Sequence, residues 1–254
     1  MANLNARQQQ LLEQIQAEGE LKINELKLRY DVTEMTIRRD LEKLEKLGDV
    51  RRTFGGVVWI GRDVALQVRA EAMREEKNRI GKKAAAYVQP GESVFIDGGS
   101  TTLQIARSLT PLAGLTVVTN ALNVAAELQN RSIPVIVTGG MLRESTSSMV
   151  GPIASQAVSQ MVFDRAFLGT SGFTASHGFS NTNLYEAEIK RLAIKQAKQA
   201  NVVMDHSKFG VKVLFSFAEI GSVHRIVTDE APDEEIARQC MDTGLEIVVA
   251  DDKR

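Results

Sequence analysis

Two adjacent arginines on a short amphipathic stretch have a clear candidate chemistry. Arg38 and Arg39 lie within the run from Thr36 to Leu41. A planar guanidinium pairs with phosphate oxygens or with the O6 and N7 edge of guanine, so this pair is suited to contacting DNA. Ordinary solvated surface helices also combine leucines on one side with charges on the other. The elements on either side are therefore needed to distinguish a DNA-contacting helix from an ordinary surface helix.

Three short helices are expected around these arginines. Ile37, Leu41 and Leu44 recur at helical spacing and share the apolar face of the third helix, whereas Arg39 and Lys43 fall on its other face. The first helix carries Arg7, Leu11 and Ile15, the second spans about Lys22 to Arg29, and Thr33 caps the third.

A β-hairpin is expected directly after the third helix. Val50 to Phe54 is typical of a strand, Gly55 and Gly56 of a turn, and Val57 to Ile60 of the returning strand. Three helices and a hairpin predict a winged helix-turn-helix, whose outgoing strand offers cations to phosphates. The residues expected to contact DNA are Thr33, Met35, Thr36, Arg38, Arg39, Lys43, Arg51 and Arg52.

Overall charge gives no support to DNA binding by bulk electrostatics. The 254-residue chain has a formal net charge of −1, and its first 60 residues hold ten basic and ten acidic side chains. Binding follows the local field and not the sum, so a DNA-binding helix with cations concentrated on one face remains compatible with this composition.

The remaining composition favours a cytoplasmic protein without a metal or a cofactor. Cys240 is the single cysteine and is expected to be a buried structural thiol. His177, His206 and His224 lie far apart, and none has metal-ligand spacing to another histidine or to the cysteine. No long apolar run and no leader pattern is present, so no membrane partner is expected.

The rest of the chain predicts a Rossmann-like α/β domain with a mainly parallel sheet. Residues 61–75 are polar and mixed in charge, which suits a linker between a DNA-binding domain at 1–60 and an α/β domain at 76–254. A helix is expected from Glu71 to Val88. The expected strands are Ser93 to Asp97, Leu115 to Thr119, Pro134 to Thr138, Arg165 to Gly169, Asn201 to Asp205, Arg225 to Thr228 and Leu245 to Val249.

Small and hydroxyl-bearing residues follow the first four of these strands. The segments are 97–102, 119–120, 138–140 and 170–172. Open α/β sheets bind ligands at the carboxyl ends of their strands, and glycine amides with nearby hydroxyls form an anion cradle. Glycine also closes strand-to-helix turns for geometric reasons alone. The absence of a dinucleotide fingerprint favours a small, polar, anionic ligand.

Two further charged segments permit a structural and a functional interpretation. Glu186 and Lys190 are spaced as an i,i+4 pair on a helix surface, which needs no function. Lys208 lies in a turn directly after an expected strand, from which it can reach the same ligand site and neutralise an anion. We keep both interpretations for each segment.

These residues resemble the DeoR family of bacterial transcription repressors, and the resemblance covers nearly the whole chain. The matching positions in the DNA-binding part are Arg7, Leu11, Ile15, Thr33 and the run Thr36 to Leu41. A Glu-Ala-x-x-Lys helix at 186–190 and an Asp-x-Ser-Lys-Phe-Gly turn at 205–210 match the family's sensor domain. The resemblance implies a fold shared with ribose-5-phosphate isomerase and CoA transferases.

The resemblance also implies an effector site and its ligand class. DeoR-type sensor domains bind phosphorylated sugars or related metabolites. The implied effector-binding residues are Asp97, Gly99, Ser100, Thr101, Thr102, Asn120, Gly140, Arg143, Ser171, Glu186 and Lys208. We therefore expect a repressor of a carbohydrate-utilisation operon that binds double-stranded operator DNA and a small phosphorylated metabolite. Operator recognition needs repeated contacts, so a homodimer or homotetramer is expected.

A sugar-phosphate isomerase-like enzyme with an accessory N-terminal domain is the alternative. Asp97, Glu186 and Lys208 supply an acid, a base and a cation, and Glu186 or Glu188 is a candidate nucleophile for CoA transfer. Spacing alone does not bring these groups within hydrogen-bond reach. A catalytic domain also has no need of a fused DNA-binding domain, so we expect the chain not to be an enzyme.

Overall fold

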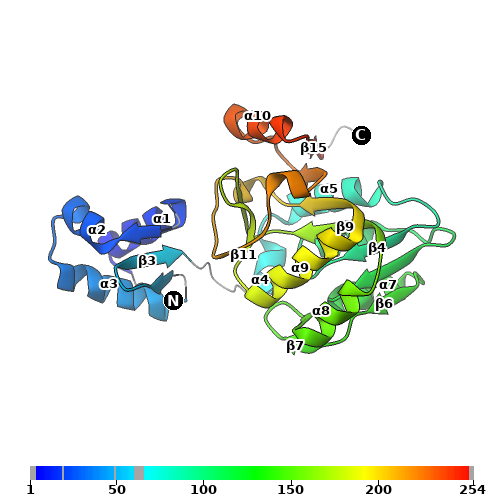
Figure 1. Ribbon diagram of the computed structural model, residues 1–254, viewed down its shortest axis with the longest axis horizontal. Helices are drawn as coiled ribbons and strands as arrows, with labels where there is room; N and C mark the ends of the chain where they lie inside the picture. Colours follow the sequence, from blue (N-terminus) through cyan, green and yellow to red (C-terminus); the bar gives the residue numbers. More distant parts are fainter. Residues whose placement is uncertain (1–3, 19, 49, 60–65, 252–254) are drawn as a thin grey trace.

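The structure is a computed structural model that describes residues 4–18, 20–48, 50–59 and 66–251. Figure 1 shows the small N-terminal domain, in blue and cyan, beside a larger α/β domain. The N-terminal elements are α1 (Ala6–Glu18), β1 (Glu20–Lys22), α2 (Ile23–Tyr30), α3 (Glu34–Lys46), β2 (Val50–Arg52) and β3 (Gly56–Trp59).

The N-terminal domain is a winged helix-turn-helix, as the sequence predicts. Leu11 and Ile15 of α1 and Ile37, Leu41 and Leu44 of α3 have no exposed surface and form one hydrophobic cluster. Fully burying such side chains is worth about 1.5–3 kcal/mol each, which fixes α3 against α1 and turns its charged face outward. The expected apolar face is thus confirmed.

The hairpin differs in detail from the prediction. Strand β2 ends at Arg52, so Phe54 lies in the turn, and Gly56 belongs to β3, where it pairs with β1. A Cβ atom at Gly56 would lie 2.4 Å from the Leu21 carbonyl oxygen, so this close approach of β1 requires glycine. Three-residue β1 carries no alternating pattern and was not expected. Ile60 lies outside the described residues.

A parallel sheet of seven strands, in the order β15-β14-β12-β9-β4-β5-β6, forms the centre of the larger domain. Each strand overlaps one of the seven segments that the sequence predicts, although β9 begins two residues earlier than predicted, and β12 begins four residues earlier and ends two residues earlier. The strands are β4 (Ser93–Ile96), β5 (Thr116–Thr119), β6 (Val135–Val137), β9 (Phe163–Gly169), β12 (Ala197–Val203), β14 (Arg225–Thr228) and β15 (Glu246–Val249). The helices are α4 (Leu66–Glu71), α5 (Arg74–Ala85), α6 (Thr102–Ser108), α7 (Leu122–Asn130), α8 (Pro152–Ser159), α9 (Leu184–Gln196) and α10 (Glu234–Asp242).

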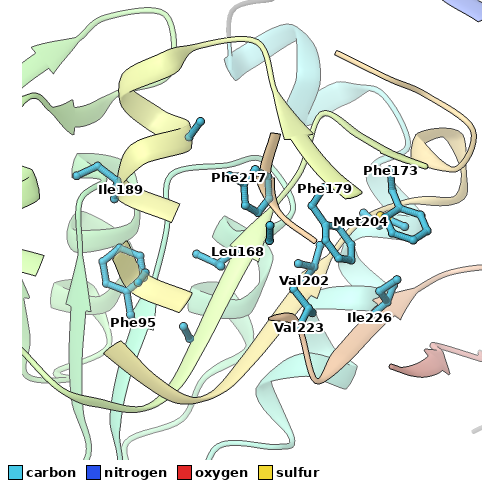
Figure 2. Packing of buried hydrophobic residues seen from close by; sticks show 14 of the residues in the cluster. Phe95, Leu168, Phe173, Phe179, Ile189, Val202, Met204, Phe217, Val223 and Ile226 are labelled. Atoms are coloured by element: carbon cyan, nitrogen blue, oxygen red, sulfur yellow. The ribbon is translucent and has the colours of Figure 1, made fainter. Parts of the chain in front are cut away.

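Alternate residues of the strands face two separate cores. Phe95, Leu168 and Val202 pack with Ile189 of α9 in one cluster (Figure 2), whereas their neighbours in the strands, such as Ile96, belong to a second cluster with α5, α6 and α7. The two-residue period of a strand produces this division. A sheet buried on both faces keeps the carboxyl ends of its strands in fixed positions.

Two small antiparallel sheets were not expected. One contains β10 (Gly172–Thr174), β11 (Gly178–Asn181) and β13 (Phe215–Ala218), and the other pairs β7 (Met141–Arg143) with β8 (Ser148–Val150). Short 3₁₀ turns lie at His206–Lys208 and Ile220–Ser222. Phe173, Phe179 and Phe217 attach the first of these sheets to the core (Figure 2).

The expected linker also differs from a plain connection. Helix α4 occupies part of the range 61–75, and its Leu66 amide donates to the Ser145 carbonyl oxygen at 2.8 Å. The polar composition that indicated a linker belongs here to a short helix attached to the α/β domain. Among the described residues, no helix combines the length and the apolar character that crossing a membrane requires.

Candidate functional site

Helix α3 presents its predicted contact residues to solvent. Thr33 caps the helix, and its hydroxyl accepts from the Thr36 amide at 3.3 Å. Arg39 is exposed, Met35 is 61% exposed, and Arg38 forms an ion pair with Glu34 at 2.8 Å. A surface ion pair is worth little, so Arg38 can exchange it for a phosphate or a base edge.

The cations beside α3 are equally accessible. Lys43 is exposed, and its ammonium donates to the Gln8 side chain at 3.0 Å. On the wing, Arg51 is exposed and Arg52 pairs with Glu45 at 2.7 Å. The structure therefore brings all eight predicted DNA-contacting residues to the surface of α3, its cap and the wing.

Phe54 at the wing tip is a candidate contact that sequence reasoning missed. Its side chain is fully exposed, in the turn between β2 and β3. An exposed aromatic ring at such a tip is suited to an apolar contact in a DNA groove. The sequence places this phenylalanine directly before Gly55 and Gly56, but the strand expected from Val50 to Phe54 included it.

Asp40, in contrast, has a structural role. Its carboxylate accepts from Arg7 at 2.7 Å and from the Gln8 amide at 2.8 Å, and Asp40 is only 4% exposed. These bonds join α1 to α3. The acidic residue beside the two arginines therefore orients the helix and does not face a DNA partner.

The large cavity of the α/β domain lies where the strand order reverses. Strands β5 and β6 follow β4 on one side, while β9, β12, β14 and β15 lie on its other side. The cavity has a volume of about 580 Å³, and the segments after β4, β9 and β12 line it. Open α/β sheets bind ligands at such a switch point, and this volume suits a small molecule.

Cations outnumber carboxylates among the described residues that line the cavity. The cations are Arg69, Lys77, Lys190 and Lys208, and the carboxylates are Glu186 and Asp205. Ser100, Thr101 and Ser171 add hydroxyl groups. This combination favours a ligand that carries negative charge together with hydroxyl groups.

A buried ion pair forms the base of this cavity. The Lys190 ammonium pairs with the Asp97 carboxylate and donates to the Gly169 carbonyl oxygen at 2.9 Å. Asp97 also accepts from the Gly169 amide at 3.1 Å, which joins β4 to β9. Burial raises the pKa of Asp97, although the Lys190 charge opposes the shift. Lys190 of α9 thus pairs with Asp97 in the loop after β4, and not with Glu186 as the i,i+4 spacing indicated.

Glu186 lies at one wall in a hydrogen-bond network. Its carboxylate accepts from Ser148 at 2.9 Å and from the Asn181 amide at 2.9 Å, and Asn181 in turn accepts from the Ser171 hydroxyl at 2.7 Å. Burial acts to raise the pKa of Glu186, but the Lys190 charge and the hydroxyl and amide donors outweigh it and lower the pKa. An ionised Glu186 can accept hydrogen bonds from ligand hydroxyls.

Six of the predicted effector residues line the cavity: Gly99, Ser100, Thr101, Ser171, Glu186 and Lys208. Two more lie directly beneath it. Asp97 is 1% exposed, and the fully buried Thr102 hydroxyl bonds to the carbonyl oxygens of Asp97 and Gly99 at 3.0 and 3.2 Å. These two residues hold the loop in shape.

The other three predicted effector residues are not among those lining the cavity. The Asn120 amide donates to the Met149 carbonyl oxygen at 3.1 Å, and a Cβ at Gly140 would meet the Val150 carbonyl oxygen at 2.8 Å. Arg143 lies 3.8 Å from the Glu186 carboxylate. Asn120 and Gly140 follow β5 and β6, which lie on the side of β4 away from β9. Their contacts with Met149 and Val150 show that these loops pack against β8.

Several lining residues were not predicted as site residues. Arg69 and Lys77 come from α4 and α5, Asn181 from β11, and Lys190 from α9. The sequence signal followed strand ends, so residues that reach the cavity from helices or from an antiparallel strand escaped it. Leu12 of α1 also lines the cavity.

A group of potential metal ligands lies beside this site, although none was expected. His206, Asp229 and Glu230 place their ligand atoms within 4.8 Å of one another. Asp229 already accepts from the His206 imidazole at 2.6 Å, and this hydrogen bond raises the pKa of His206. The group comes from turns after two different strands, which spacing along the chain does not reveal.

Both halves of the chain match models of known domains. Residues 7–62 match the DeoR-like helix-turn-helix domain, and residues 72–230 match the DeoR C terminal sensor domain. The chain belongs to the DeoR family. The fold gives two residues of the family signature a structural role, because Arg7 and Asp40 form the ion pair between α1 and α3 described above.

DeoR-family relatives match the chain over nearly its full length. The HTH-type transcriptional regulator IolR of Bacillus subtilis is 32% identical over 247 residues, which are 95% of this chain and 98% of IolR. The transcriptional repressor CsqR of Escherichia coli is 30% identical over 96% of this chain and 95% of CsqR. A putative aga operon transcriptional repressor of Escherichia coli is 29% identical over 96% and 93%.

Solved structures resemble the chain more distantly. Ribose 5-phosphate isomerase A of Methanocaldococcus jannaschii has a TM-score of 0.41 and 15% identity, over 54% of this chain and 55% of the isomerase. The sorbitol operon regulator SorC of Klebsiella pneumoniae has a TM-score of 0.37 and 10% identity, over 74% and 85%.

Membership of the DeoR family decides between the two functions considered from the sequence. The chain is a DNA-binding transcriptional regulator, and its relatives are regulators and not enzymes. The isomerase-like alternative is therefore set aside, and the acid, base and cation that motivated it belong to a sensor domain.

Proposed function

We propose that this DeoR-family regulator represses a carbohydrate-utilisation operon and leaves DNA when a phosphorylated sugar or related metabolite occupies the cavity. The excess of cations over carboxylates around the 580 Å³ cavity carries the proposal, together with its hydroxyl groups. Phosphate provides charge for the cations, and a sugar provides donors for carboxylates and amides. We propose that residues 1–60 form the DNA-binding domain and that the sensor domain comprises 76–254 together with α4 and the start of α5. The protein is proposed to act in the cytoplasm.

Distinct parts of the cavity suit distinct parts of such a ligand. Ser100 and Thr101, each 7% exposed, offer hydroxyl groups in the loop after β4, and Lys208 adds charge from the turn after β12. Asn181 and Glu186, which also line the cavity, offer an amide and a carboxylate for sugar hydroxyls. We infer that the phosphate is bound at the loop after β4 and that the sugar extends toward Glu186.

Helix α3 is proposed to enter the major groove. Met35, Thr36, Arg38 and Arg39 then lie near base edges or phosphates, and Arg51 and Arg52 of the wing contact the backbone. The balanced charge of this domain predicts that binding relies on these local cations.

A homodimer or homotetramer is proposed as the functional form, because one domain of this size makes too few contacts for operator specificity. Apolar side chains on adjoining elements support a subunit interface. Ile136 of β6, Met141 and Leu142 of β7, and Ile153 of α8 are 47%, 61%, 49% and 67% exposed. Monomers rarely leave such a group uncovered.

Release from DNA requires the ligand to favour one arrangement of the oligomer over another. The ligand can shift this equilibrium only by its difference in affinity for the two arrangements. We propose that the ligand-bound arrangement spaces the α3 helices incorrectly for the operator half-sites.

A mobility-shift assay at fixed salt tests the proposal. The purified protein is mixed with the DNA upstream of its own gene, with and without triose, pentose and hexose phosphates. We expect a specific shift that one phosphorylated sugar reverses, while the same sugar without phosphate does not. A specific shift that no phosphorylated sugar changes would contradict the proposed effector class.

A further inference from the structure

Arg69 reaches the ligand cavity from a segment whose composition indicated a linker. It lies on α4, the first described helix after the wing, and it lines the cavity together with residues that follow β4 and β9. The amide of Leu66 at the start of α4 bonds to the Ser145 carbonyl oxygen at 2.8 Å. The helix therefore contacts the α/β domain at both of these points.

The guanidinium of Arg69 has buried donors without a partner. Its Nε and Nη2 atoms are both buried, and neither makes a hydrogen bond within the described part of the protein. A buried and unpaired charged donor is strongly unfavourable, so evolution removes such groups unless they have a use. Burial lowers the pKa of this guanidinium, yet arginine remains protonated at neutral pH.

The two unpaired atoms have a specific geometry. Nε and Nη2 form one edge of the guanidinium and donate in parallel, which matches two oxygens of a phosphate or a carboxylate. The carboxylate of Glu186, which also lines the cavity, already accepts from Ser148 and Asn181. The free edge of Arg69 is thus available to an anion that enters the cavity.

Lys77 holds Arg69 in place. Its ammonium donates to the carbonyl oxygens of Arg69 and Ala72, at 2.6 Å each, and lies 3.9 Å from the Asp205 carboxylate. Lys77 is only 4% exposed, and burial lowers its pKa. This side chain links the end of α4 to Asp205 in the segment after β12, so the position of α4 depends on the cavity wall.

We propose that the Nε and Nη2 edge of Arg69 binds the phosphate of the effector and that α4 transmits occupancy of the cavity to the DNA-binding domain. The inference rests on the proposed function and adds the residue that binds the anionic group of the ligand. When the effector occupies the cavity, its phosphate pairs with Arg69 and thereby stabilises one position of α4. Because α4 follows the wing in the chain, a change in α4 changes the connection to the DNA-binding domain.

The variants Arg69→Gln and Arg69→Lys test the phosphate contact, with Arg74→Gln as the matched control. Arg74 begins α5, and its side chain is 66% exposed. Calorimetric titration with the sugar phosphate that binds the wild type should give a dissociation constant about 10- to 100-fold higher in Arg69→Gln, a smaller increase in Arg69→Lys, and no change in the control. The ligand-free Arg69→Gln variant should melt no earlier than the wild type, because the arginine is unpaired there.

Hydrogen exchange of residues 66–71 tests the role of α4. The ligand should slow exchange of these amides in the wild type but not in Arg69→Gln at equal occupancy. Equal affinity of both proteins, or an early melting transition in ligand-free Arg69→Gln, would overturn the inference.

Inorganic phosphate separates this inference from the proposed function. If no sugar phosphate binds the wild type, the proposed effector class fails, and millimolar phosphate then serves as the probe. A rise in melting temperature in the wild type and the control but not in Arg69→Gln supports the anion contact. An equal rise in all three proteins, or no rise in any of them, contradicts it.

Discussion

The two candidate functional surfaces of this regulator contain cations in opposite environments. On α3 and the wing, Arg39 and Arg51 are exposed, and the ion pairs of Arg38 and Arg52 lie in water. In the sensor cavity, Lys77 and Lys190 are buried, and Lys190 is paired with a buried carboxylate. Exposed cations cost little and act through their placement, whereas buried cations strongly affect stability and bind anions with little screening.

The comparison predicts its largest effect for Lys190→Met. Removal of the ammonium leaves the buried Asp97 carboxylate without its cationic partner, which costs about 3–5 kcal/mol in the free energy of unfolding. Urea denaturation followed by circular dichroism measures it. Lys46→Met on α3 is the matched control, because Lys46 is 75% exposed and should change stability by less than about 0.5 kcal/mol. Adding Asp97→Asn to Lys190→Met should recover part of the loss. Equal losses of stability in Lys190→Met and Lys46→Met would contradict the difference between buried and exposed cations.

Thr101→Glu should come next in size. This side chain lines the cavity and is 7% exposed, so a carboxylate there repels an anionic ligand in a poorly screened site. Like charges cost several kcal/mol in such sites, so the affinity for the sugar phosphate should fall by about 100-fold or more while DNA affinity stays unchanged. Calorimetry and a DNA mobility shift measure the two effects. Thr101→Gln has the same size without the charge, and equal losses in both variants would attribute the effect to size.

A smaller effect is expected from Arg39→Ala on the exposed surface. If Arg39 forms a bidentate contact with a base, operator binding should weaken by about 1–3 kcal/mol, and thermal stability should not change. Fluorescence anisotropy with labelled operator DNA measures the affinity. Arg74→Ala removes an exposed arginine outside the DNA-binding domain and serves as the control. Unchanged affinity of Arg39→Ala would remove this residue from the interface.

The smallest predicted effect depends on pH and concerns His206 beside the cavity. Its hydrogen bond to Asp229 raises the pKa of His206. A raised pKa means that the pair stabilises the fold below the unfolded pKa of about 6.5 and loses this contribution as pH rises through the folded pKa. His206 is 37% exposed, so water screens the pair, and His206→Gln should cost only a few tenths of a kcal/mol. The cost should be present near pH 6 and absent near pH 9 in urea titrations, and the reverse order would contradict the assignment.

Periodicity predicted the larger elements of the fold and failed on the short ones. Central strands such as β4 and β5 are short apolar runs that are almost entirely buried, and such runs carry a strong signal. Strand β1 has three residues and exists because it pairs with β3, which no local pattern expresses. Helix α4 has a polar sequence, and only contacts such as Leu66 to Ser145 reveal that it belongs to the sensor domain.

The cavity was predicted in part because strand ends are visible in the sequence, whereas strand order is not. Ser100, Thr101 and Ser171 follow β4 and β9, which are neighbours in the sheet. Asn120 and Gly140 also follow strands, but these strands lie on the other side of β4. The same sequence pattern therefore predicted them as site residues although they do not line the cavity. Arg69 and Lys190 reach the cavity from helices, and their distance in the chain from the strand-end loops concealed them.

Coupling between the two surfaces is the central claim, and one linked pair of titrations tests it most directly. Operator DNA is titrated by fluorescence anisotropy with and without a saturating sugar phosphate, and the sugar phosphate is titrated by calorimetry with and without operator DNA. Thermodynamic linkage requires the same factor in both directions, and we predict that each ligand weakens the other by about 5- to 150-fold. A sugar phosphate that binds in the cavity but leaves operator affinity unchanged would contradict the account.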